Sequence, residues 1–223
     1  MNKKFTRNDD DDEDGEDFPN PKKVQYYKRA IPSFEMIVNL NDSIRDPGHY
    51  FDLVEEMGTL NDCDIVDFKT SSLGGRLDGL VYLLNAIKDC AAPVIGTLSG
   101  EAASAATVLL LACDGIRVKP YSTMMIHSAS FGYMNHQSNM VNQATFVDKQ
   151  ARKILTDAYQ DFLLPEELGR VFDGLEVRLD YDEINERLER REEIREKRLM
   201  ELREQKSEQP KKPSRKKKEP TQA

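Results

Sequence analysis

Residues 93–113 read PVIGTLSGEAASAATVLLLAC, and this stretch decides the fold. The apolar run of residues 93–98 predicts a buried strand. The small residues 99–103 predict a tight turn, and residues 104–113 predict a helix that is apolar on almost every side. Because such a helix can only be internal, we expect the core to form around this segment.

A similar unit precedes it in the chain. Residues 65–68 (IVDF) predict a strand, residues 70–75 (TSSLGG) predict a turn, and a helix follows with apolar residues at i, i+3, i+4 and i+7. Further short strands are predicted at residues 36–40, 115–118 and 124–126, and another helix at residues 50–60. Strands that alternate with helices indicate βαβ units, so the predicted class is α/β with a mainly parallel sheet.

A long amphipathic helix is predicted over about residues 139–162. Its apolar positions are spaced alternately by three and four residues: Met140, Ala144, Val147, Ala151, Ile154, Ala158 and Phe162. At 1.5 Å per residue it is more than about 30 Å long, the width of a small domain. Either it projects and meets a second copy of the chain in a homo-oligomer, or it lies across its own sheet.

Charge is distributed unevenly along the 223 residues, of which 32% are charged. Residues 1–17 carry a balance of −5 and residues 182–223 a balance of +3, which leaves −6 for residues 18–181. We therefore expect a disordered acidic arm at residues 1–30, one domain at 31–181, a solvated Glu/Arg-rich helix at 182–206 and a disordered basic tail at 207–223. The apolar residues of the charged helix do not keep a heptad, so a coiled coil is only weakly indicated.

Several classes of protein are disfavoured. There is no run of about 18 apolar residues and no apolar secretory segment, so we expect a cytoplasmic protein that does not enter a membrane. The acidic domain argues against nucleic acid as the partner. The three cysteines are widely spaced without a CxxC pair, and neither a metal nor a cofactor is predicted.

Ser104 and His127 are the candidates for chemistry. Ser104 lies at the predicted start of the internal helix, where a serine is either a simple N-cap or a nucleophile beside free N–H groups. His127 ends an apolar strand, where a histidine is either a structural hydrogen-bonding residue or a general base. Their combination with the Gly74-Gly75 turn favours catalysis.

Three short motifs make the chain resemble a known family. In order, it contains Ser72-Leu73-Gly74-Gly75, Gly100-Glu101-Ala102-Ala103-Ser104 and Met125-Ile126-His127. From about residue 31 to 179, this order resembles the proteolytic subunit of the caseinolytic (Clp) protease, a serine peptidase with a crotonase-type fold of repeated ββα units and a projecting handle helix. The resemblance implies that Ser104 is the nucleophile, His127 the general base, and the amides of Gly75 and Ala105 the oxyanion donors. We expect Ser104 Oγ within about 4 Å of a His127 nitrogen.

The acidic member of the triad is where the chain departs from the family. The family has an aspartate where this chain has Glu176, which makes Glu176 the aligned candidate, with Asp173 and Asp180 as alternatives. Leu73 replaces a usual proline and Ala105 a usual methionine. After residue 179 the family's closing segment is replaced by the charged helix.

The resemblance implies a serine endopeptidase that cleaves polypeptides inside a homo-oligomeric ring or double ring, joined by the helix near residues 139–162. The chain has no Gly-x-x-x-x-Gly-Lys phosphate loop, so any AAA+ unfoldase that supplies ATP dependence would be a separate partner. Three alternatives remain: a viral capsid-maturation (prohead) protease of the same superfamily, a catalytically impaired structural subunit, and a crotonase-type acyl-CoA enzyme. The last would not need both Ser104 and His127.

Overall fold

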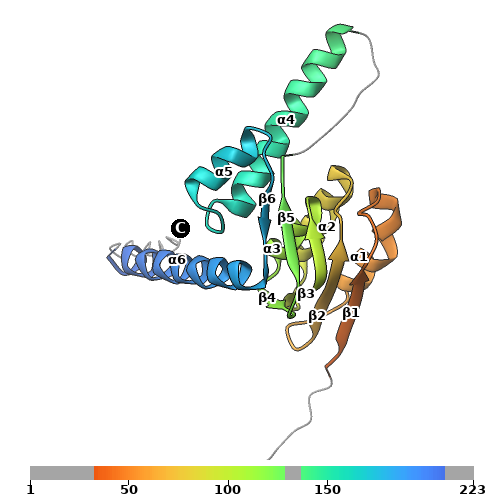
Figure 1. Cartoon of the computed structure of the whole chain (residues 1–223). Coiled ribbons are helices and arrows are strands. Elements are labelled where there is room, and N and C mark those ends of the chain that lie inside the picture. Colours follow the sequence, from red (N-terminus) through yellow and green to blue (C-terminus); the bar gives the residue numbers. More distant parts are fainter. Residues whose placement is uncertain (1–32, 129–136, 209–223) are drawn as a thin grey trace, which may run out of the picture. The chain divides into compact units, whose positions relative to one another are not determined.

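The computed structural model describes residues 33–128 and 137–208 (Figure 1). Apart from its first two residues, which belong to the last helix, the predicted tail at 207–223 lies, like the predicted arm at residues 1–30, outside this described part. Its elements are, in chain order, β1 (Glu35–Leu40), the 3-10 helix η1 (Pro47–Tyr50), α1 (Phe51–Met57), β2 (Ile65–Ser72), α2 (Leu77–Asp89), β3 (Val94–Ala103), α3 (Ala105–Ala112), β4 (Gly115–Val118), β5 (Thr123–Ile126), α4 (Gln137–Tyr159), α5 (Pro165–Phe172), β6 (Val177–Leu179) and α6 (Tyr181–Glu208). None of the described helices is long and apolar enough to cross a membrane.

The strands of the described residues form one sheet in the order β1-β2-β3-β5-β6. β1, β2, β3 and β5 run parallel, and only β6 is antiparallel to its neighbour. On the side of β3 away from β2, β4 pairs with the first half of the strand and β5 pairs with the second half. The mainly parallel sheet flanked by helices confirms the predicted α/β class.

The turn predicted at residues 99–103 is wrong, because β3 continues through Ala103. The second half of β3 is held on both sides, by Ser72 of β2 opposite Ala102 and by β5 from Thr123 onward. The small residues serve close approach between strands. A Cβ atom added to Gly100 would lie 2.6 Å from Ser71 Oγ.

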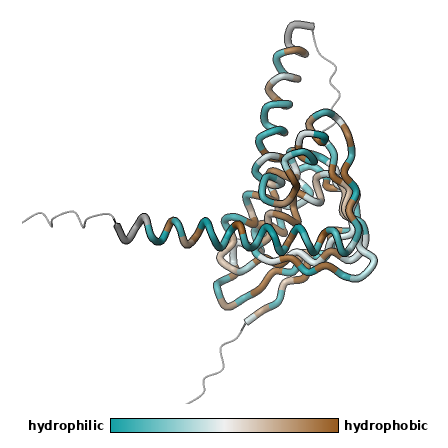
Figure 2. The backbone as a smooth tube through the Cα atoms, turned by 60° about the vertical axis from the view of Figure 1, so that its left-hand side comes forward, coloured by the Kyte–Doolittle hydropathy of each residue, from teal (hydrophilic) through white to brown (hydrophobic). Residues whose placement is uncertain are grey.

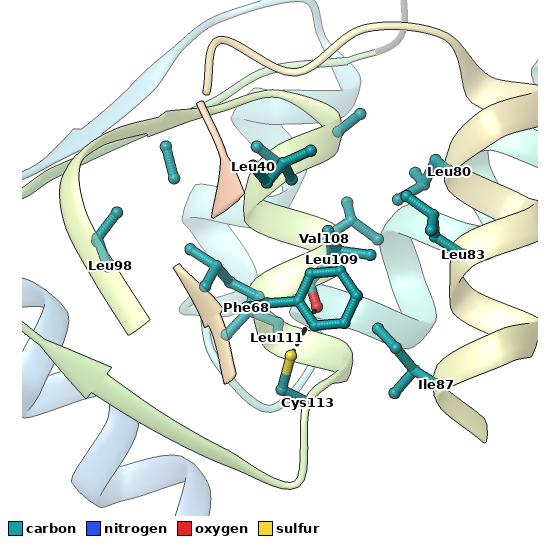
Figure 3. Close-up of a cluster of buried hydrophobic side chains, with 14 of the residues drawn as sticks. Leu40, Phe68, Leu80, Leu83, Ile87, Leu98, Val108, Leu109, Leu111 and Cys113 are labelled. Atoms are coloured by element: carbon teal, nitrogen blue, oxygen red, sulfur yellow. Dashed lines mark hydrogen bonds between the residues drawn. The ribbon is translucent and has the colours of Figure 1, made fainter. Parts of the chain in front are cut away.

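The core lies between the sheet and the helices α2 and α3. Seven of the eight residues of α3 are buried, which confirms that this helix is internal. Figure 3 shows the ring of Phe68 from β2 among side chains of α3, with Leu83 and Ile87 of α2 nearby. Burying each leucine of this cluster contributes about 1.5–3 kcal/mol. α3 is therefore a firm platform for the residue that precedes it.

The two ends of α4 have different surroundings. Its first turns extend away from the sheet in Figure 1, and Val141 and Phe146 there are 64% and 61% exposed. Its last turn is packed against α3, and Tyr159 is completely buried. The helix overlaps the predicted handle helix at residues 139–162, beginning two residues earlier and ending three residues earlier. It presents apolar side chains that no described segment covers.

The charged helix α6 is not solvated along its whole length, contrary to expectation. Figure 2 shows that most of its residues are hydrophilic, yet Ile184 is completely buried and Arg191 is only 6% exposed. Arg191 donates to the carbonyl oxygen of Leu111 at the end of α3, and Arg187 pairs with Glu167 of α5 at 2.6 Å. Burial lowers the pKa of Arg191 to about 10, so the guanidinium remains charged at neutral pH. α6 is thus attached to the domain by arginines as well as by apolar contacts.

One edge of the sheet gathers the ends of several strands. β2, β3 and β5 are parallel, so their carboxyl ends lie at the same edge. β6 is antiparallel to β5, so it begins at that edge. The residues that follow β2, β3 and β5, and those that precede β6, are therefore brought together although they are distant in the sequence.

Candidate active site

Ser104 joins β3 to α3 in a strained turn. Its backbone has φ 55° and ψ −125°, a conformation that residues other than glycine rarely adopt. The Ser104 amide donates to the carbonyl oxygen of Met125 at 2.8 Å, which fixes the turn beside β5. Its side chain makes no capping hydrogen bond to α3. The simple N-cap role is therefore not realised. In α/β-hydrolases a sharp strand-to-helix turn exposes the nucleophilic serine hydroxyl.

The Gly74-Gly75 turn lies directly against the Ser104 turn. Both glycines have positive φ, 89° and 150°. A Cβ atom added to Gly74 would lie 2.8 Å from the nitrogen of Ala105 and 2.6 Å from the carbonyl oxygen of Ala103. Only glycine allows this approach, which brings the backbone after β2 next to the first amide of α3.

Ser72 holds the glycine turn from the other side. Its hydroxyl donates to the carbonyl oxygen of Asp42 at 2.7 Å and accepts a hydrogen bond from the Gly74 amide at 3.2 Å. In the sequence, Ser72 stands in a family motif but carries no expected role. Its only local signal is a small polar residue before a glycine pair.

The amides of Gly75 and Ala105 are both available as donors. Within residues 33–128 and 137–208, neither donates a backbone or side-chain hydrogen bond. Ala105 is the first residue of α3, where amides have no partner within the helix and the helix dipole favours negative charge. Two free N–H groups beside a serine hydroxyl can stabilise an oxygen that becomes negative during acyl transfer.

His127 follows β5 at the same edge of the sheet and is partly buried. It lines one cleft together with Ser104, Ala105 and Gly75. Across the described residues no hydrogen bond joins His127 to the Ser104 hydroxyl, so their direct contact stays a prediction. Catalytic hydrogen bonds are often long before substrate binds.

Glu176 immediately precedes β6. In the antiparallel register Ile126 pairs with Val177, so the next residues outward, His127 and Glu176, leave the sheet side by side. Ile126 and Val177 are both buried in the core. The Glu176 carboxylate, however, accepts two hydrogen bonds from Arg178, at 2.9 and 3.2 Å, and it does not line the cleft.

The two alternative acids are placed differently. Asp180 lies beyond the far end of β6 and forms reciprocal hydrogen bonds of 3.0 Å with Glu183, which cap the start of α6. The three residues of β6 separate it from Glu176, so the Cα atoms of Asp180 and Glu176 are four residue steps apart, about 14 Å along an extended strand. Asp173 is exposed at the end of α5. The register therefore favours Glu176 over both.

The cleft itself has a volume of about 1100 Å³. Its apolar walls come from three helices, with Leu80 of α2, Val108 of α3 and Ile154 of α4 among the lining residues. Arg45 and Arg76 lie at its charged rim, each paired with a neighbouring aspartate at 2.6 Å. Such an apolar lining suits apolar groups better than it suits a small charged metabolite.

Comparison with known proteins gives a direct result. The family model described as Clp protease matches residues 26–162, more than half of the chain. Four of the candidate residues (Gly75, Ser104, Ala105 and His127) lie within the match, and Glu176 lies outside it. No curated protein sequence matches the chain closely enough to count as a relative. The chain, with its mixed α/β fold, belongs to the Clp protease family.

Proposed function

We propose that the protein is a serine endopeptidase that hydrolyses peptide bonds at the cleft beside Ser104. One observation carries the proposal. Ser104, which has φ 55° and a hydroxyl that makes no capping hydrogen bond, lies beside two amides that have no partner among the described residues. That arrangement matches acyl transfer, which needs a nucleophile next to donors for an oxyanion. Membership of a peptidase family supports the same reaction.

The proposed reaction has two halves. Ser104 Oγ attacks the peptide carbonyl while His127 takes its proton, and the carbonyl oxygen, now negative, accepts hydrogen bonds from the amides of Gly75 and Ala105. The C–N bond then breaks, the leaving amine takes the proton from His127, and an acyl-serine remains. Water then attacks this ester while His127 accepts a proton from the water. The ester C–O bond breaks, His127 returns the proton to Ser104 Oγ, and the carboxylic acid is released.

In this proposal Glu176 orients His127. Its present pairing with Arg178 does not oppose that role strongly, because both side chains are at least half exposed. An exposed ion pair contributes about 0–1 kcal/mol, so rotating the carboxylate toward His127 costs little. The pairing of Ile126 with Val177, the strand neighbours of His127 and Glu176, supports this role.

The exposed part of α4 supports assembly into a homo-oligomer, either a ring or a double ring. Val141 and Phe146 are more than 60% exposed on a helix whose other end is anchored in the domain. A second copy of the chain would cover them. Polypeptides would be the substrates, and an unfoldase, where one takes part, would be a separate AAA+ protein.

Hydrolysis of a fluorescently labelled unfolded protein and of a library of fluorogenic peptides tests the proposal. Wild type should cleave, whereas Ser104→Ala and His127→Ala should lose activity by about 10³-fold or more while keeping the same circular dichroism. Ser99→Ala is the matched control, because Ser99 is an exposed serine of β3 outside the cleft and should leave turnover unchanged. Equal activity of wild type and Ser104→Ala would refute the proposal.

A second candidate function is a structural subunit that keeps the fold and has lost the chemistry. The observation in its favour is the Glu176–Arg178 pairing, which leaves His127 without a carboxylate partner among the described residues. This candidate predicts a folded, assembled wild type that neither cleaves peptides nor reacts with serine-directed probes. The peptidase assay therefore separates the two candidates.

A further inference from the structure

The carbonyl oxygen of Ser104 is held by two hydrogen bonds from a single residue. Thr107, in the first turn of α3, donates its amide at 3.0 Å and its hydroxyl at 2.6 Å to this oxygen. The carbonyl of Ser104 and the N–H of Ala105 belong to the same planar peptide group. Fixing the oxygen therefore fixes the direction in which the Ala105 N–H points.

Tyr159 completes this arrangement from α4. Its hydroxyl lies 2.6 Å from Thr107 Oγ1, and both side chains are completely buried. The single hydroxyl proton of Thr107 is used in the bond to Ser104, so the proton between the two hydroxyls must come from Tyr159. Burial, partly offset by the bond to Thr107, raises the pKa of Tyr159, so the phenol keeps this proton throughout the neutral range.

We propose that Thr107 and Tyr159 are positioning residues that hold the Ala105 amide in the direction required to bind the oxyanion. The inference rests on the proposed function, in which Ala105 is one of the two donors. Donation by Tyr159 polarises the Thr107 hydroxyl and strengthens its bond to the Ser104 carbonyl. Both side chains are shielded from bulk solvent.

This role differs from simple packing in what it predicts. A buried hydrogen bond that only stabilises the fold changes the free energy of unfolding when it is lost. A bond that aims an oxyanion donor also changes kcat and leaves KM unchanged, because the donor contacts the substrate oxygen chiefly in the transition state.

The test uses the whole chain and three variants. Thr107→Val removes the hydroxyl and keeps the shape, Thr107→Ser keeps the hydroxyl, and Tyr159→Phe removes only the outer donor. Thr97→Val is the matched control, since Thr97 is also buried and donates its hydroxyl to Asp67 at 2.7 Å on a strand outside the cleft. For each protein we would measure kcat and KM on a peptide ester, and the affinity for a peptide boronate and for the corresponding peptide amide.

Thr107→Val should lower kcat by about 10- to 100-fold, less than the roughly 10²–10³-fold loss when an oxyanion donor is removed outright. Affinity for the boronate, whose tetrahedral adduct carries an oxygen at the oxyanion position, should fall by a similar factor. KM and the affinity for the amide should stay constant. Thr107→Ser should keep a kcat close to that of wild type, and the kcat of Tyr159→Phe should lie between those of Thr107→Val and Thr107→Ser. Thr97→Val should keep the wild-type kcat.

Three results would overturn the inference, and the first is distinguishable from the other two. If the wild-type protein shows no turnover, or turnover that Ser104→Ala retains, the proposed function is refuted and the inference with it. An active wild type in which Thr107→Val keeps the kcat of Thr97→Val would refute the positioning role alone. Loss of stability in Thr107→Val without loss of kcat would also refute that role, because the bond would then be purely structural.

Discussion

Substitution of Gly74 by alanine tests the geometry of the site in one step. Gly74 has φ +89°, and a Cβ atom there would lie 2.6 Å from the carbonyl oxygen of Ala103 and 2.8 Å from the nitrogen of Ala105. Gly174, between α5 and β6, has a similar φ of +85°, but apart from its own chain neighbours no atom lies within 4 Å of an added Cβ. Gly174→Ala is therefore a matched control for the backbone strain without the steric contact.

The magnitudes follow from these two environments. A positive φ costs an alanine about 1–2 kcal/mol, which both variants share. The contacts at Gly74 add about 1–3 kcal/mol, because backbone atoms on both sides must shift. Gly74→Ala should therefore lower the free energy of unfolding by about 2–5 kcal/mol and Gly174→Ala by about 1–2 kcal/mol.

The added methyl group should also change the chemistry. It would cover the Ala105 amide, and loss of one oxyanion donor lowers kcat by about 10²–10³-fold. Urea unfolding followed by circular dichroism measures the stability, and hydrolysis of a peptide ester under native conditions measures kcat. Equal stability of the two variants, together with unchanged turnover in Gly74→Ala, would refute the close approach of the two turns.

Three further outcomes are expected. Leu109→Ala, at a fully buried position of α3, should lower the free energy of unfolding by about 3–5 kcal/mol in urea titration. Burial tends to raise the pKa of Glu167, but the hydrogen bonds from Arg187 and the Leu164 amide outweigh burial, and the net effect is a lowered pKa. The ionised carboxylate therefore stabilises the fold at pH values above the ordinary glutamate pKa of about 4.3. The stability difference between wild type and Glu167→Gln should thus be full at neutral pH and vanish as the pH falls through the lowered pKa; a difference that persists in acid would contradict the pairing. Glu176→Gln should lower kcat by about 10-fold or more with KM unchanged, and an unaltered kcat would remove Glu176 from the triad.

Local patterns predicted much of the architecture. The internal helix and the alternation of strands with helices were visible because burial imposes a period that neighbouring residues reveal. The extent of β3 was not visible, since residues 99–103 form a strand only through partners in β2 and β5. β6 has three residues and is defined by its pairing with β5 alone.

The candidate site likewise combines residues that local motifs reveal with contacts that only the fold brings together. Ser104, His127 and the glycine pair stand in short motifs, so the sequence marks them as candidates, and the structure brings Ser104, His127 and Gly75 to one cleft. The bond between Thr107 and Tyr159 joins residues 52 positions apart and has no local signature. The burial of Arg191 was likewise unforeseeable, because an arginine in a charged helix is usually solvated and its acceptor, the Leu111 carbonyl, lies 80 positions away in the sequence.

Covalent labelling of the serine tests most directly whether Ser104 is an activated nucleophile. The intact, folded protein would be incubated with a fluorophosphonate, and the modified residue identified by mass spectrometry of its peptides. We expect a single phosphonyl adduct on Ser104 that is absent from Ser104→Ala and formed more slowly by His127→Ala. Labelling that is equal in wild type and Ser104→Ala, or no labelling of a folded and assembled wild type, would contradict the role of Ser104 as the nucleophile.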